Sequence, residues 1–313
     1  MSDWIWALII GFVLDLLLGD PSWLYHPVCL IGKYISWMEK KLRRRGGNLR
    51  KSAVFLTAST VLLTMAVVAL IMMLCGLLGR IPLLIAMALL DWMGIAITSM
   101  AKEARGVEKA LGRGVAAGRT QVARIVGRDT QELSEEEIIK ATVETVSENT
   151  TDGVISPLLY AAIGGPILLW GFKAASTLDS MVGYLDEKYR DIGWSSAKLD
   201  DVLNYIPARL TALLMVIASY LIGLDGKNAF RIVRRDHANH KSPNCAWSES
   251  AAAGALHIQL GGTHNYFGKT VEKPTIGDAD RPAERADIRR ANRLLYTSSL
   301  LMMVLIVLIA IAR

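Results

Sequence analysis

The stretch from residue 52 to residue 78 reads SAVFLTASTVLLTMAVVALIMMLCGLL, and it decides the fold class. It contains no charged side chain. A helix needs about 20 apolar residues to cross the hydrocarbon core of a bilayer, so this stretch predicts a membrane-spanning helix. The whole chain agrees, because 52% of its 313 residues are hydrophobic, only 20% are charged and the mean hydropathy is +0.33. This composition is typical of an integral membrane protein.

Other apolar stretches predict further membrane segments. They cover residues 4–18, 81–100, 154–172, 206–223 and 294–312. The first is short and contains Asp15, and 154–172 is broken by Gly164, Gly165 and Pro166. Such a break allows a re-entrant segment where the backbone is buried in protein. We therefore expect an all-α, polytopic integral membrane protein with about five to six membrane segments.

Basic residues in the connecting segments predict the orientation. The formal net charge is +6, and eight Lys and Arg residues lie between residues 33 and 51. Because cytoplasmic loops retain Lys and Arg, this segment and the helical loops 101–152 and 224–293 are expected on the cytoplasmic side of the cell membrane. If every predicted segment crosses the membrane, residues 173–205 lie on the outer side. If the segment 154–172 is re-entrant, they do not. Basic runs lack interleaved stacking aromatics, so the lipid bilayer and not nucleic acid is the expected partner.

The chain is expected to form a single domain over residues 1–313. It shows no internal repeat of the kind that many transporters contain. Its cysteines, Cys29, Cys75 and Cys245, form no CxxC pair, so neither a disulfide framework nor a structural zinc site is expected.

A helix with paired carboxylates is predicted before the stretch 154–172. Ser134 and Glu137 match the capping-box pattern, so the helix should begin near residue 135 and end in a turn at 149–153. Glu144 and Glu148 then share one face, where like charges repel unless a cation lies between them. Mg²⁺ binds one or two carboxylates together with substrate phosphates. Glu148 and the following Asp152 are therefore candidate metal ligands, with a solvated helix face as the alternative. A second charged helix is expected over 283–293, leading into the last span.

Later segments carry further candidates. Asp179 and Asp201 are candidate metal ligands near the ends of apolar stretches. Arg209 enters an apolar run, where an unpaired guanidinium is costly, so we expect a carboxylate or phosphate partner, with snorkelling to the interface as the alternative. His240 is a candidate proton carrier or phosphate contact. A zinc site with His237 is not expected, because no third soft ligand is nearby. Residues 261–266 are expected to form a tight loop near a phosphate.

Together these segments resemble the CobD/CbiB family of cobalamin-biosynthesis membrane proteins, the adenosylcobinamide-phosphate synthases. The resembling segments, in one order over nearly the whole chain, are 14–21, 26–28, 125–130, 148–157, 178–184, 199–211, 240–244, 260–268 and 273–274. The chain departs from the expected pattern at Ser176 and within 245–249.

The resemblance implies an ATP- and Mg²⁺-dependent amide ligase. It would join a propionate carboxylate of adenosylcobyric acid to (R)-1-aminopropan-2-ol phosphate, or to a related amino alcohol, and give adenosylcobinamide phosphate. Arg128, Arg209 and Lys173 would neutralise phosphate charge, and His240 or a carboxylate would take the proton of the amine. The remaining substrate- and ATP-binding candidates are Asp15, Asp20, His26, Asp129, Asn149, Ser180, Ser242 and Asn244. Other membrane enzymes of the cobalamin pathway are candidate partners.

Two other functions remain open at this point. A polytopic Mg²⁺-dependent prenyl or phosphoalcohol transferase would also place acidic pairs at helix ends, although Asp200 and Asp201 lack a third aspartate at fixed spacing. A transporter for a corrinoid or another anion would use Asp15 and Asp91, which lie within apolar stretches.

Overall fold

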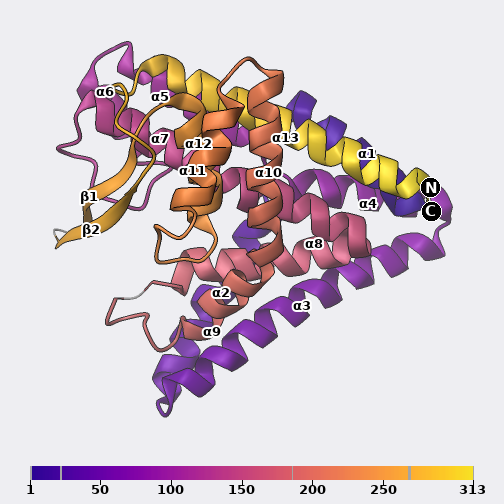
Figure 1. The fold of residues 1–313 in the computed structure, drawn as a ribbon. Coiled ribbons are helices and arrows are strands. Elements are labelled where there is room, and N and C mark those ends of the chain that lie inside the picture. The colour runs from indigo at the N-terminus through magenta and orange to yellow at the C-terminus, as the bar shows by residue number, and fades with distance from the viewer. Residues whose placement is uncertain (1, 22, 185, 267–268, 313) are drawn as a thin grey trace. The chain divides into compact units, whose positions relative to one another are not determined.

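Helices make up almost the whole structure, a computed structural model that describes residues 2–21, 23–184, 186–266 and 269–312 (Figure 1). The predicted all-α class is confirmed. Contacts divide the chain into two compact units. Unit 1 contains Met1–Ala96, Ser156–Asn204 and Leu305–Arg313, and unit 2 contains Ile97–Ile155 and Tyr205–Val304. The expectation of a single domain stays a prediction.

Unit 1 is built around the long apolar helix α3. Its helices are α1 (Asp3–Leu18), α2 (Pro27–Arg45), α3 (Leu49–Leu77), α4 (Arg80–Gly94), α8 (Ser156–Val182) and α9 (Trp194–Leu203). Helix α3 packs against α2, α4, α8 and α9 (Figure 1). Helix α1 packs on α4 at Gly11, where a Cβ atom would lie 2.8 Å from the carbonyl oxygen of Ala88 and from the amide nitrogen of Trp92. Glycine is therefore required for this close backbone approach.

The predicted break in 154–172 is confirmed as a kink inside α8. Gly164 and Gly165 leave the helical conformation, and Gly165 has φ 61° and ψ −161°. Pro166 has no N–H to donate, which favours the break at this point. Beyond the kink, the Trp170 indole donates to the Leu90 carbonyl oxygen over 3.0 Å and ties α8 to α4.

Unit 2 combines helices with one hairpin. Its elements are α5 (Ile97–Leu111), α6 (Val115–Val122), α7 (Glu135–Asn149), the π-helical turn η1 (Thr150–Ile155), α10 (Tyr205–Leu221), α11 (Gly226–Asp236), α12 (Cys245–Leu256), β1 (Leu260–Tyr266), β2 (Lys269–Ile276) and the first part of α13 (Arg285–Ala312). The predicted capping box is confirmed, because the Ser134 hydroxyl accepts from the Glu137 amide and Glu137 accepts from the Ser134 amide. The charged helix predicted over 283–293 is confirmed as the start of α13.

Two local predictions in unit 2 were wrong. The turn at 149–153 is absent because η1 continues from α7 toward α8 as a widened helical turn, a form that is frequent at functional sites. The tight loop at 261–266 is strand β1, which pairs antiparallel with β2 from Leu260 opposite Ile276. The register shifts between Gly261 and Thr263. Gly261 has φ 72°, and such a conformation suits a β-bulge as well as a loop.

Membrane-spanning helices are confirmed by length and composition. Within the described residues, the helical stretches that are long and apolar enough are Leu49–Leu77, Arg80–Leu111, Glu135–Val182 and Arg285–Ala312. A fifth exists if the bent pair Trp194–Leu203 and Tyr205–Leu221 forms one span. The predicted first span, 4–18, corresponds to α1, whose 16 residues are too few for that set.

Candidate functional site

Unit 2 gathers carboxylates where α7 packs against α12. One oxygen of Glu144, Oε2, lies 3.0 Å from Nη1 of Arg128. The other, Oε1, accepts from the backbone N–H of Gly261 over 2.8 Å. One turn along α7, Glu148 Oε1 accepts from the thiol of Cys245 over 3.2 Å. The helix face that Glu144 and Glu148 share thus contacts Arg128 in a loop, Gly261 in a strand and Cys245 at the start of α12.

Arg128 is a buried cation whose hydrogen bonding is incomplete. Its side chain is 4% exposed, and Nε and Nη2 have no hydrogen-bond partner among the described residues. Buried polar groups are normally paired, and a buried guanidinium with free N–H groups is costly. An anion that reaches these two donors would remove that cost. The neighbouring Asp129 is partly exposed.

Two further buried groups in this cluster have pKa values that burial raises. Burial raises the pKa of the Glu249 carboxyl, and the nearby carboxylates of Glu144 and Glu148 raise it further, against the opposing effect of Lys273 and Arg128. Burial likewise raises the pKa of the Cys245 thiol. The thiolate is the nucleophilic form of cysteine, so this shift disfavours a nucleophilic role for Cys245. Its thiol instead donates a hydrogen bond to Glu148.

His240 lies beside the same carboxylates. Burial lowers the pKa of its imidazole, and Lys273 lowers it further, while Glu148 and Glu144 oppose the shift. The backbone N–H of Ser242 donates to Nδ1 of His240 over 3.0 Å. In the neutral ring this bond leaves the proton on Nε2, which becomes a donor. The geometry therefore suits contact with a phosphate or carboxylate oxygen better than proton abstraction.

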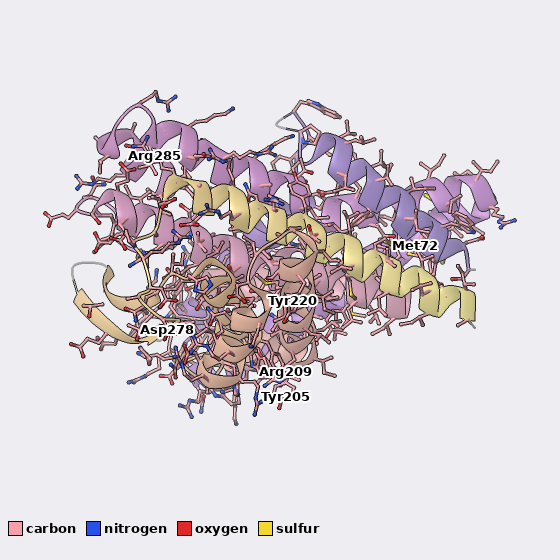
Figure 2. The ribbon with its side chains drawn as sticks, turned by 45° about the horizontal axis from the view of Figure 1, so that its top comes forward. Met72, Tyr205, Arg209, Tyr220, Asp278 and Arg285 are labelled. Carbon is pink, nitrogen blue, oxygen red and sulfur yellow. The ribbon has the colours of Figure 1, made fainter. Side chains whose placement is uncertain are left out.

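Arg209 connects α10 to the segment 240–244. Its Nη1 donates to the carbonyl oxygen of Tyr205 over 2.6 Å and to Oδ1 of Asn244 over 3.4 Å. The guanidinium carbon lies 3.4 Å from the centroid of the Tyr205 ring and 4.7 Å from that of Trp247. Figure 2 shows Arg209 and Tyr205 next to each other. Carbonyl, amide and aromatic groups thus contact Arg209 in place of the predicted carboxylate, and a phosphate partner stays a prediction.

The other unit 2 candidates take local positions. Asn149 donates back to the Thr145 carbonyl oxygen over 2.9 Å, so its amide is turned onto its own helix. The Ser242 hydroxyl accepts from the backbone N–H of Asn244 over 3.3 Å, and this bond shapes the loop before α12. Asp152 lies in η1 and contributes to the raised pKa of the Cys245 thiol, behind the larger effect of burial.

Unit 1 holds a separate group around His26. Its Nε2 lies 4.0 Å from Oδ1 of Asp20, and its ring centroid lies 6.3 Å from that of Trp170. Burial lowers the pKa of His26, Asp20 opposes this, and Lys173 lowers it further. The structure thus brings the predicted residues Asp20, His26 and Lys173 together. Asp15 is fully buried in α1.

The predicted metal ligands are divided between the units. Asp201, on α9, lies 3.7 Å from the Lys198 ammonium. Asp179, near the end of α8, accepts through its backbone carbonyl from the Gly183 amide over 2.7 Å, and the neighbouring Ser180 is exposed. Within the part of the chain that the structure describes, no group of three His, Cys, Asp or Glu side chains could hold a metal ion. A site completed by phosphate oxygens stays a prediction.

A family match decides what this chain is related to. The sequence model of the family described as CobD/Cbib protein matches residues 8–295. The chain belongs to the CobD/CbiB family. Relatives named cobalamin biosynthesis protein CobD include those of Listeria monocytogenes strain F2365, 48% identical over 92% of this chain and 93% of the relative, and of Geobacter metallireducens, 47% identical over 96% and 94%. The cobalamin biosynthesis protein CbiB of Salmonella typhimurium is 44% identical over 96% of each chain. No solved structure matches.

Sequence reasoning missed three members of the cluster in this CobD/CbiB chain: Glu144 as an ion-pair partner, Glu249 and Lys273. Glu249 offered a signal, because it is the single charged residue between Cys245 and Leu256 in an alanine-rich helix. A lone carboxyl in such a helix is expected to face a polar site, since burying it elsewhere is costly. Lys273 stands in a strand and gave no comparable signal.

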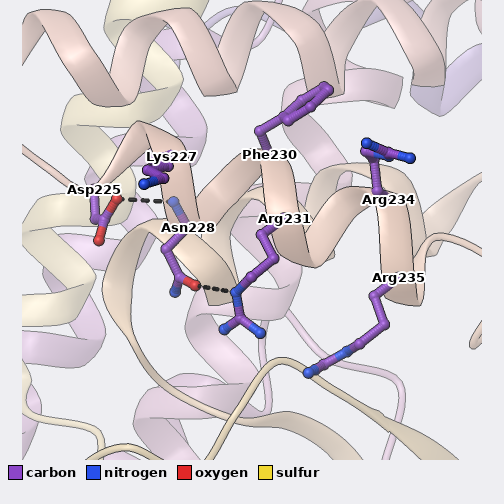
Figure 3. A pocket seen from close by; sticks show the side chains of 7 residues that line it. All are labelled: Asp225, Lys227, Asn228, Phe230, Arg231, Arg234 and Arg235. Carbon is purple, nitrogen blue, oxygen red and sulfur yellow. Dashed lines mark hydrogen bonds between the residues drawn. The ribbon is translucent and has the colours of Figure 1, made fainter.

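An open pocket of about 640 Å³ lies elsewhere in unit 2, over α11 (Figure 3). Its lining residues are Asp225, Lys227, Asn228, Phe230, Arg231, Arg234 and Arg235. The Asp225 carboxylate accepts from the backbone N–H of Asn228, and the side-chain oxygen of Asn228 accepts from Nε of Arg231 (Figure 3). Arg231 and Arg235 both contact the Asp278 carboxylate. Much of the charge in this pocket is therefore paired within the protein.

Proposed function

We propose that this CobD/CbiB chain is an ATP- and Mg²⁺-dependent amide ligase of cobalamin biosynthesis in the cytoplasmic membrane. It joins a propionate carboxylate of adenosylcobyric acid to the amine of (R)-1-aminopropan-2-ol phosphate, or of a related amino alcohol. The product is adenosylcobinamide phosphate. The names of the relatives support the pathway, and the apolar helices support the membrane. Other membrane enzymes of the pathway are its proposed partners.

The observation that carries the proposal is the half-paired Arg128 beside the carboxylates of unit 2. Its two free donors suit a phosphate oxygen or a carboxylate, the groups that every substrate of this reaction carries. Glu144 holds the guanidinium in place through Nη1 and is itself held by the Gly261 amide.

The reaction needs two steps. A carboxylate oxygen of the corrinoid attacks the γ-phosphorus of ATP, forming an acyl phosphate as the bond to ADP breaks. The amine then attacks the acyl carbon, and phosphate leaves with the electron pair of the broken C–O bond. The proton lost by the amine goes to a carboxylate. Arg128 stabilises the charge that develops on the phosphate oxygens.

Mg²⁺, when bound, neutralises charge on the phosphates of ATP. Glu148 and Asp152 would hold this ion, because both are carboxylates, and Glu148 lies at the face where α7 meets α12, with Oε1 3.2 Å from the Cys245 sulfur. A preformed cage is not required, since Mg²⁺ keeps several waters and takes phosphate oxygens as ligands. Asp179 and Asp201 stay proposed metal ligands in unit 1.

The remaining residues are assigned to binding. His240 donates from Nε2 to a substrate oxygen, as the Ser242 bond to Nδ1 favours. Arg209, whose guanidinium carbon lies 3.4 Å from the centroid of the Tyr205 ring, supplies a cation to a phosphate, with Asn244 beside it. In unit 1, Lys173 supplies a cation to an anionic group of a substrate, next to Asp20 and His26.

The test uses the full chain purified in mild detergent. ATP, Mg²⁺, adenosylcobyric acid and the amino-alcohol phosphate are supplied together and then omitted one at a time, with ADP and adenosylcobinamide phosphate measured by mass spectrometry. We expect product only with all four. Absence of adenosylcobinamide phosphate when all four are present would overturn the proposal, and corrinoid uptake into vesicles without covalent product would indicate a transporter. R128Q and D152N should each lose at least tenfold in rate, whereas R285Q, on an exposed ion pair, should match the parent.

A further inference from the structure

Helix α2 in unit 1 is amphipathic in an unusual way. Its buried side is apolar and consists of Ile31, Ile35, Met38 and Leu42. Its outer side mixes exposed apolar and aromatic groups with cations. Leu30 is 59% exposed and Trp37 is 54% exposed, and just before the helix Trp23 is 79% exposed. A tryptophan side chain that is more than half exposed is costly in water. Tryptophan is enriched where a protein contacts the interface of a membrane.

The charge on α2 is almost entirely positive. Its basic residues are Lys33, Lys40, Lys41, Arg43, Arg44 and Arg45. Its one acidic residue, Glu39, pairs with Arg43 over 2.8 Å. Lys41 lies over the Trp37 ring at 4.9 Å, and Lys33 lies over the Tyr25 ring at the same distance. The other cations on the outer side therefore face solvent with no acidic residue of α2 to balance them.

A pocket of about 510 Å³ runs along this outer side. It is lined by Cys29, Gly32, Lys33, Ser36, Trp37 and Lys40 of α2 and by Met181 of α8. Lys33 and Lys40 stand two helical turns apart, with Ser36 between them. The wall that Met181 and Trp37 form is apolar. One cavity thus offers cations, a hydroxyl and an apolar surface, the three features of a phospholipid binding site.

The place of α2 in the chain favours a lipid over a soluble anion. Only three residues, 46–48, separate the end of α2 at Arg45 from the start of α3 at Leu49, and α3 is a candidate membrane span. The apolar window of α3 is only 11% buried within the protein, so most of its surface is available to lipid. A basic, aromatic helix directly before such a span is expected at the surface of the bilayer.

We propose that α2 lies in the membrane interface and that its pocket binds the headgroup of an anionic phospholipid. The phosphate contacts Lys33, Lys40 and Ser36, and the first part of an acyl chain lies against Met181 and Trp37. The residues of this site belong to unit 1 and none of them is part of the Arg128 cluster, so the proposal does not depend on the reaction that we propose.

The test measures lipid retention by native mass spectrometry on the full chain in detergent. Phosphatidylglycerol and phosphatidylcholine with the same acyl chains are compared. We expect tighter binding of phosphatidylglycerol, and an affinity about 30-fold lower in K33Q/K40Q, from the usual effect of two lysines near an anionic surface. Phosphatidylcholine binding should be unchanged, and K33R/K40R should bind like the parent.

The matched control removes the same charge from another exposed basic helix. K227Q/R234Q on α11 should lower phosphatidylglycerol affinity by less than threefold, because neither side chain lines the α2 pocket. Equal losses in the two double variants would show general charge attraction and overturn the site. So would equal binding of the two lipids by the parent. Inorganic phosphate at millimolar concentration should displace neither lipid, and displacement of phosphatidylglycerol would point to a soluble anion instead.

Discussion

Replacing Glu144 with methionine should destabilise the protein more than replacing its partner Arg128. E144M leaves the Arg128 guanidinium, 4% exposed, without the carboxylate that pairs with it, and also leaves the Gly261 amide without its acceptor. Removing one member of a buried pair typically costs about 3–5 kcal/mol, and we expect about 4 kcal/mol here. R128M leaves a carboxylate that is 15% exposed and still accepts from Gly261, so we expect about 2 kcal/mol.

The double variant R128M/E144M separates the pair from its surroundings. Replacing a whole buried ion pair by apolar side chains is often nearly neutral, so the double variant should lose only about 1–2 kcal/mol, less than E144M alone. The free energy of unfolding is measured by denaturant titration of the full chain in mild detergent, followed by circular dichroism. R285Q is the reference, because Arg285 pairs with Glu135 at the surface, where the loss should stay below about 1 kcal/mol (Figure 2).

Equal losses in E144M and R128M, or a double variant whose loss is the sum of both, would refute the reasoning. Either result would mean that the guanidinium finds other partners and is not left short of an anion. The same variants also test whether the Arg128 cluster binds Mg²⁺ and ATP. Mg²⁺ and ATP should raise the stability of the parent by mass action and should raise that of R128M much less.

Three further predictions concern separate parts of the chain. Because burial and Lys273 hold the pKa of His240 below its usual value of about 6.5, the stability that His240 contributes is present above that pH and is lost as the pH falls through the folded value. The melting temperature of the parent should therefore fall more than that of H240Q between pH 7.5 and pH 5.5, and parallel profiles would contradict this. S134A removes the capping box of α7 and should cost about 1 kcal/mol, with S134T losing much less, as unfolding titrations would show. G11A should lower the melting temperature sharply, because its Cβ would meet backbone atoms of α4 at 2.8 Å, whereas G127A, with open space around it, should not.

Local features of the chain were predictable because they depend on neighbours in sequence. The capping box at Ser134 and the shared face of Glu144 and Glu148 follow from spacing alone, and both are present. The glycine break in α8 was equally local. The turn at 149–153 was predicted from turn-favouring Asn, Asp and Gly residues, but the helix on each side continues through them as η1, so tertiary context overrode propensity.

The composition of the unit 2 cluster was only partly predictable, because it depends on packing between distant segments. Arg128 reaches Glu144 from the loop before α7, and Gly261 reaches the same carboxylate from β1, more than a hundred residues later. Glu249 approaches both glutamates because α12 packs on α7. No periodicity in the sequence relates these positions, so chemistry identified most of the polar residues but not their partners.

The charges of this cluster favour a cation and a phosphate together over either alone. Arg128 and Lys273 bring two positive charges, and Glu144, Glu148 and Asp152 bring three negative ones, while burial raises the pKa of the Glu249 carboxyl and so favours its uncharged form. The sum is one negative charge, which repels a free phosphate. A bound divalent cation changes the sum to one positive charge, which attracts it. If Glu249 were ionised, the sum with the cation would be zero and that attraction would disappear. We therefore predict that E249Q, whose side chain at this position cannot ionise, binds Mg²⁺ and ATP as the parent does, and clearly weaker binding by E249Q would contradict this account of the charges.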